Sequence, residues 1–152
     1  MTHIGSGSDY TIYWYNGAGT WTLENGGGVQ IAESTVGNVW LRNSAGSLYA
    51  WNGGAWVAVP MPLPLVNWWG GELAPISIAV APDQNLWMVA NMPYSMGSND
   101  HAIFQMVQFN SPGDNAWTLM PGGGVQISVS PIGKPWLTNY EHVAFALETL
   151  AP

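Results

Sequence analysis

Apolar and polar side chains alternate along the chain in short runs, and Gly- or Asn-containing turns separate these runs. The segments Val29–Glu33, Asn38–Arg42 and Ser47–Trp51 show the pattern, with turns at 37–38 and 43–46 between them. Such alternation is typical of half-buried β-strands, and the turns place Gly or Asn where positive φ is needed. No stretch combines a helix cap with a 3.6-residue apolar period. The sequence therefore predicts an all-β fold.

The chain also contains an internal repeat, which is the first feature to settle in such a sequence. Residues 21–31 and 117–127 are identical at nine of eleven positions, and both begin Trp-Thr-Leu and end Gly-Gly-Gly-Val-Gln-Ile. The residues Trp40, Trp87 and Trp136 follow at equivalent places, 47 and 49 residues apart. A more divergent middle copy begins at 76–80. The repeat unit is therefore about 48 residues long.

Each repeat unit holds four predicted strands. The first is of the 29–33 type and the second of the 38–42 type; the third, at 47–51, is echoed at 13–17 and 106–110, and the fourth starts at Trp21, Trp56 or Trp117. Four short antiparallel strands per unit are the pattern of a β-propeller blade. We expect one domain over 1–152, with blades at 28–59 and 75–120 and a blade shared between 9–24 and 124–148.

The repeat does not begin and end in phase. The chain opens with the third and fourth strands of a blade (10–15 and 20–24) and closes with the first, the second and a candidate third (125–129, 134–139 and 143–147). About three blades are too few for a closed propeller, and an open arc exposes apolar faces and strand edges. We therefore expect a homodimer that closes six blades, with Trp40, Trp87 and Trp136 equivalent and largely buried.

Three segments carry a resemblance to a known family. They are Trp40-Leu41-Arg42-Asn43, then residues 46–53 (Gly-Ser-Leu-Tyr-Ala-Trp-Asn-Gly), then residues 56–60 (Trp-Val-Ala-Val-Pro). In this order they resemble the tectonin-type β-propeller repeat, over about residues 10–147. Many tectonin-like proteins are lectins, so the resemblance implies carbohydrate binding. The Pro-rich stretch 60–75 and an insertion at 92–102 depart from the family pattern.

Charge excludes several function classes. Arg42 and Lys134 are the only Lys or Arg residues, against nine acidic residues. Nucleic-acid binding needs many cations to neutralise phosphates, and a polybasic membrane patch needs them too. No apolar run approaches the roughly 20 residues of a membrane helix, so we expect no membrane insertion. No signal peptide is visible, and both a secreted or cell-surface location and a leaderless cytoplasmic one stay open.

Candidate chemistry for catalysis or metal binding is sparse. The three His residues are scattered, Cys is absent, and no zinc-ligand spacing occurs. The Gly runs lack the Lys and helix of a phosphate loop, no nucleophile elbow is present, and no carboxylate pair is marked by spacing. Asn99-Asp100-His101 is best explained as a solvated loop tip. We therefore expect no enzyme, no metal and no cofactor.

Three Trp residues fall outside the blade pattern and suggest a ligand site. They are Trp14, Trp68 and Trp69. Neighbouring side chains of an extended segment point to opposite faces, so one of Trp68 and Trp69 should be free to stack on a sugar. We predict a glycan site formed by Asn67, Trp68, Trp69, Glu72 and Trp14. A carbohydrate-binding module is therefore the first hypothesis, and a structural or protein-interaction propeller segment of a surface or filament assembly is the alternative.

Overall fold

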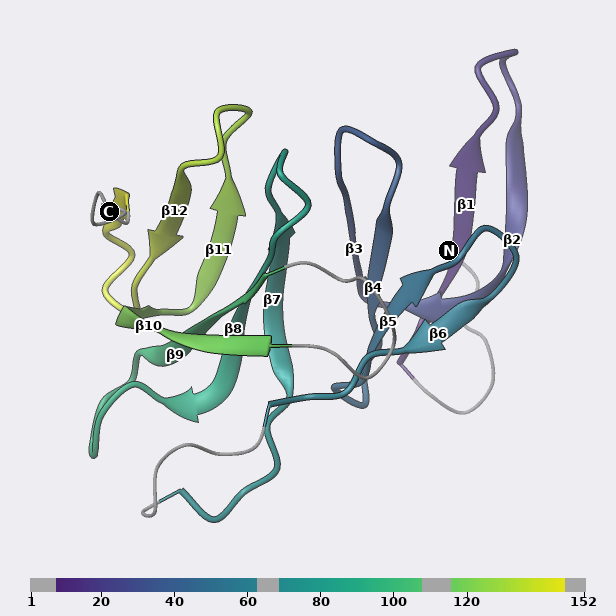
Figure 1. The fold of residues 1–152 in the computed structure, drawn as a ribbon. Helices are drawn as coiled ribbons and strands as arrows, with labels where there is room; N and C mark the ends of the chain where they lie inside the picture. The colour runs from purple at the N-terminus through teal and green to yellow at the C-terminus, as the bar shows by residue number, and fades with distance from the viewer. Residues whose placement is uncertain (1–7, 63–68, 108–115, 147–152) are drawn as a thin grey trace.

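A computed structural model describes residues 8–62, 69–107 and 116–146, and these ranges contain thirteen β-strands and no helix. The strands form four separate antiparallel sheets that lie side by side along an arc (Figure 1). The expected all-β fold of propeller-type blades is confirmed.

The four sheets follow one another in chain order. The N-terminal hairpin consists of β1 (Tyr10–Tyr15) and β2 (Trp21–Gly28). The second blade consists of β3 (Gln30–Glu33), β4 (Val39–Arg42), β5 (Leu48–Trp51) and β6 (Trp56–Ala58). The third blade consists of β7 (Pro75–Val80), β8 (Leu86–Pro93), β9 (His101–Val107) and β10 (Ala116–Gly124). The C-terminal sheet consists of β11 (Gln126–Val129), β12 (Pro135–Thr138) and β13 (Ala144–Ala146).

The first strands of successive sheets line the inside of the arc. Strand β3 contacts β7, and β7 contacts β11. The chain passes directly from the outer strand of one sheet to the inner strand of the next at two places, from β2 into β3 and from β10 into β11. A side chain would not fit at these crossings: a Cβ on Gly28 would lie 2.9 Å from the Arg42 carbonyl oxygen, and one on Gly124 would lie 2.9 Å from that of Thr138. The repeated Gly runs therefore lie where the chain passes from one sheet to the next and where a side chain has no room.

The repeat is visible in individual hydrogen bonds as well. Asn43 Oδ1 accepts the Ser47 amide at 2.7 Å, and Asn139 Oδ1 accepts the Val143 amide at 2.8 Å. Both bonds close the turn between the second and third strands of a sheet, in the manner of an Asx turn. The C-terminal sheet thus repeats the first three strands of the second blade.

The core lies mainly between the last three sheets, and each of their two contacts contains one repeated Trp. Trp40 packs between the second and third blades with Leu48, Ile78, Leu86 and Met106. Trp87 packs between the third blade and the C-terminal sheet with Val89, Ile103, Ile127 and Leu137. A third cluster on the third blade contains Leu73, Met88, Ala90, Met92, Ala102 and Phe104.

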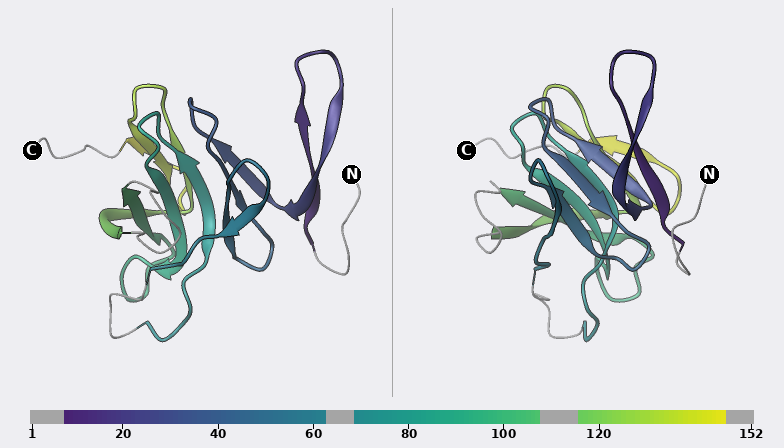
Figure 2. Two further views of the ribbon diagram at one scale, coloured as in Figure 1. Left: turned by 45° about the vertical axis from the view of Figure 1, so that its right-hand side comes forward. Right: turned by 90° about the vertical axis from the view of Figure 1, so that its right-hand side faces the viewer.

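Two expectations from the sequence were wrong. Trp136 is 46% exposed, whereas Trp40 and Trp87 are each 2% exposed. The reason is that no described sheet follows the C-terminal sheet to cover its outer face (Figure 2). The third strand of the third blade was expected at 106–110, but β9 begins at His101 and ends at Val107; the insertion at 92–102 lengthens the β8–β9 hairpin.

Candidate functional site

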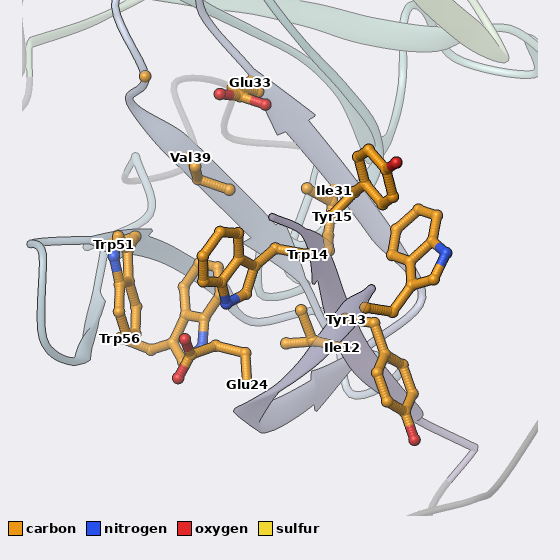
Figure 3. A pocket seen from close by; sticks show the side chains of 12 residues that line it. Ile12, Tyr13, Trp14, Tyr15, Glu24, Ile31, Glu33, Val39, Trp51 and Trp56 are labelled. Atoms are coloured by element: carbon orange, nitrogen blue, oxygen red, sulfur yellow. The ribbon is translucent and has the colours of Figure 1, made fainter. Parts of the chain in front are cut away.

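A groove of about 660 Å³ lies between the N-terminal hairpin and the second blade (Figure 3). Half of its described lining residues are aromatic, and two are acidic. They are Ile12, Tyr13, Trp14, Tyr15, Trp21, Glu24, Ile31, Glu33, Gly37, Val39, Trp51 and Trp56. The groove is therefore mainly apolar, with carboxylates as its only charged groups among these residues.

Three contacts hold the hairpin against the second blade and shape the groove. Asp9 Oδ1 accepts the Ser44 amide at 2.6 Å, at the lower end of β1. Trp56 Nε1 donates to the Asn25 carbonyl oxygen at 2.8 Å. Between these bonds, Ile12 is buried. The hairpin is thus fixed at its base, whereas its tip, at residues 16–20, extends beyond the second blade (Figure 1).

The outer end of the groove is rich in indole rings. Trp51 and Trp56 are cross-strand partners with ring centroids 5.1 Å apart and planes tilted by 58°. Trp14 projects from β1 into the same groove and is 51% exposed, and Glu24 lies with these rings (Figure 3). Three indoles beside one carboxylate form an amphipathic surface that packing alone does not require.

Neither cation of the chain takes part in the groove. Burial lowers the pKa of the Arg42 guanidinium, and the nearby Asp9 carboxylate partly offsets this effect. Arg42 Nη1 points toward the Pro75 carbonyl oxygen at 3.4 Å, in the contact between the second and third blades. Lys134 is exposed on the turn between β11 and β12. The groove therefore presents negative charge only.

The structure does not gather the predicted site residues into one place. Trp14 lines the groove, but Trp69 packs against the third cluster of the core and Glu72 lies on the connection before β7. The Glu72 carbonyl oxygen accepts Asn91 Nδ2 at 3.1 Å, while its side chain is exposed. Asn67 and Trp68 lie outside the described residues. Only Trp14 of the five is placed in the groove.

Sequence reasoning missed Trp51, Trp56 and Glu24 because the two indoles stand at repeat positions and were interpreted as packing residues. The usable signal was Trp14 itself. It occupies the repeat position that Ala50 holds in the second blade, within Tyr13-Trp14-Tyr15-Asn16-Gly17 against Tyr49-Ala50-Trp51-Asn52-Gly53. An indole where the repeat carries a methyl group points to a role outside blade packing.

The structure gives no ligand-binding role to the other candidate polar residues that it describes. Asp100, from the polar cluster at 99–101, accepts the Tyr140 amide at 2.7 Å and so ties the third blade to the C-terminal sheet. Across the described ranges, no three His, Cys, Asp or Glu residues lie close enough together to hold a metal ion. No helix in the described part of the chain is long and apolar enough to cross a membrane.

Comparison with known proteins establishes the fold. No protein-family model matches the chain, and no curated protein matches it. Among solved structures, the chain is similar to selenomethionine-substituted virginiamycin B lyase from Staphylococcus aureus, with a TM-score of 0.52 and 14% identity. The match covers 93% of this chain and 50% of that one, so the chain spans half the length of that β-propeller. The tectonin-type resemblance stays a prediction, and the β-propeller fold is shown.

Proposed function

We propose that the chain is a non-enzymatic, carbohydrate-binding β-propeller module that takes a neutral glycan at the outer end of the groove. The observation that carries this proposal is the gathering of Trp14, Trp51 and Trp56 beside Glu24. Indole faces stack on the C–H-rich faces of sugar rings, and a carboxylate accepts hydrogen bonds from sugar hydroxyls.

The size and charge of the groove support a small neutral ligand. The whole groove has a volume of about 660 Å³, and the glycan would take only its outer end. Glu24 and Glu33 would repel an anionic sugar, because no Lys or Arg in the described lining compensates them. The resemblance to lectin repeats points the same way.

Binding is a better explanation of this groove than catalysis. Hydrolysis of a glycosidic bond needs two carboxylates on either side of the bond, about 5–10 Å apart. Glu24 lies with the Trp51–Trp56 pair, whereas Glu33 lies at the other end of the groove beyond Val39 (Figure 3). Weak sites of this type act by avidity when several occur on one rigid assembly.

A Trp14→Ala variant tests the proposal. Binding to a printed array of neutral and sialylated oligosaccharides should be confined to neutral ones for the wild type and lost in this variant. The half-exposed Trp14 is not a core residue of the single chain, so the circular dichroism spectrum should stay unchanged. Tyr140→Ala, which removes an exposed ring outside the groove, is the matched control and should bind normally. Unchanged binding by Trp14→Ala would contradict the proposal.

A further inference from the structure

Each type of contact between neighbouring blades recurs with the repeat. For one copy of each type, the two contacting residues lie at opposite ends of the arc and do not meet. Trp40 is buried against Ile78 of the next blade, and Trp87 is buried against Ile127 of the next sheet. The third Trp is Trp136 and the third Ile is Ile31, and both are 46% exposed. Trp136 lies at the C-terminal end of the arc, and Ile31 lies in the groove at the N-terminal end.

A second repeated contact joins the inner strands. Gln30 Nε2 donates to the Ile78 carbonyl oxygen at 2.9 Å, and the Ile78 amide donates to Gln30 Oε1 at 3.1 Å. One blade further on, Ser77 Oγ accepts the Ile127 amide at 3.2 Å. The next residue of this series is Gln126, whose side chain is exposed. By the repeat, its partner would be the backbone of Ile31.

A third repeated contact joins the outer strands. Trp56 Nε1 donates to the Asn25 carbonyl oxygen, and Trp117 Nε1 donates to the Pro60 carbonyl oxygen at 3.1 Å. Each acceptor lies four residues after the Trp that begins the outer strand of the preceding blade. The remaining member of the series, Trp21, is 67% exposed. By the same rule, its acceptor would be the Pro121 carbonyl oxygen.

The hairpin itself stands where the third and fourth strands of a blade belong. The bond from Ser44 to Asp9 repeats the bond from Tyr140 to Asp100, which links the third blade to the C-terminal sheet. Among the described strands, β1 pairs with β2 alone. The inner half of the groove, lined by Ile31, Glu33, Gly37 and Val39, is therefore the space that the first two strands of a blade would fill.

We propose that β11 and β12 of a second copy of the chain occupy this inner half, and that two copies exchange these strands to close six blades. Trp136 of the second copy then packs on Ile31 and Val39, and Gln126 binds the Ile31 backbone. The three unmade contacts all pair one end of the arc with the other, which is why a second copy fits better than an unrelated partner.

The repeat also fixes the strand register of the exchange. In the second blade, Trp40 pairs with Ala50 and Arg42 pairs with Leu48. The equivalent pairs across two copies are Trp136 with Trp14 and Thr138 with Ile12. The six-residue β1 would replace the three-residue β13, which pairs Thr138 with Ala144 within one copy.

Charge supports the same arrangement. Asn38 Nδ2 donates to Gln84 Oε1 at 2.6 Å between the turns of the second and third blades. Lys134 repeats Asn38, and Gly37 repeats Gln84. The exchange therefore brings Lys134 of one copy to the end of the groove that carries Glu33 of the other. Association pairs Trp14 with Trp136 of the second copy and leaves Trp51, Trp56 and Glu24 at the outer end of the groove.

Engineered cysteine pairs test the register, because the natural chain contains no Cys. Directly opposed residues on neighbouring strands have Cβ atoms about 4.5–5.5 Å apart, close to disulfide geometry. Under mild oxidation, Ile12→Cys with Thr138→Cys should give a covalent dimer on a non-reducing gel. The shifted control, Thr11→Cys with Thr138→Cys, should give at least fivefold less, since Thr11 faces the opposite side of β1.

A second cysteine pair tests whether β13 must separate from β12 before two copies can associate. Thr138→Cys with Ala144→Cys closes a bond inside one copy, holds β13 on β12 and should yield a folded monomer by light scattering. A dimer in that oxidised variant, or equal crosslinking of the Thr11 and Ile12 pairs, would overturn the proposal. A ladder of covalent multimers from the Ile12 pair would contradict the closed two-copy ring. Loss of glycan binding alone would not bear on the strand-exchange proposal.

Discussion

The contact between the second and third blades and the groove at the N-terminal end are built from the same repeated residues in two different states. In the first, Trp40 and Ile78 are almost completely buried. In the second, Ile31 faces solvent, and its counterpart Trp136 is exposed at the far end of the arc. Burial of a repeat residue therefore depends on whether a neighbouring blade is present, which the residue's own sequence context does not determine.

Replacement of the repeated Trp by Ala should give the largest difference between the two regions, measured as the loss of unfolding free energy. Trp40→Ala should lower the free energy of unfolding by about 3–5 kcal/mol, because it leaves a large cavity in a closed core. Trp136→Ala should lower the stability of a single copy by about 1 kcal/mol or less, since half of the side chain is already in water. Urea denaturation of both variants, with β13 locked by the Thr138–Ala144 cysteine pair, measures the difference. Equal losses would contradict it.

The inner-strand amide contacts should give the next largest difference. Gln30→Ala removes both hydrogen bonds to Ile78 and should cost about 1–3 kcal/mol of stability, because it leaves the Ile78 amide and carbonyl unsatisfied. Gln126→Ala should leave folding unchanged and weaken association about tenfold, which corresponds to about 1.4 kcal/mol. Sedimentation velocity over a dilution series reports the second effect. Association unaffected by Gln126→Ala would show that this residue does not repeat the role of Gln30.

The blade framework could be predicted from the sequence because it rests on local signals. The Gly runs at 26–28 and 122–124 mark crossings where a Cβ would collide with backbone, and Asn43 and Asn139 close equivalent turns. The Asn turns act within a few residues, and the Gly runs stand at the same place in both copies of the repeat, so the repeat identifies both features. The lengths of β8 and β9 were missed because they depend on pairing between the two strands.

The candidate site was harder to predict because it is formed between sheets. Trp14 was identified as unusual, but Trp51 and Trp56 carry the repeat signature and gave no sign that they border a groove. Trp69 was expected to be a ligand contact, yet it packs against the third cluster of the core, on a connection whose path the sequence does not specify. The exposure of Trp136 follows from a missing neighbour, which no local pattern records.

The ion pair proposed between copies should make the smallest difference. Exposed pairs contribute about 0.2–1 kcal/mol, so Lys134→Gln should weaken association by roughly two- to fivefold. Glu33→Gln should have a similar effect, and the double variant should be no worse than either single one. Because salt screens exposed charges, raising the ionic strength should remove the difference between wild type and Lys134→Gln. Additive losses in the double variant would indicate that the two side chains do not meet.

The mass of the unmodified chain in solution tests the central claim most directly. Light scattering coupled to gel filtration should give about twice the 16.4 kDa of one chain. Ile31→Asp should convert it to a folded monomer, because a carboxylate would then have to be buried beneath Trp136 without a partner. A wild-type chain that stays at 16.4 kDa across the concentration series would contradict the claim that the open ends of the arc complete one another.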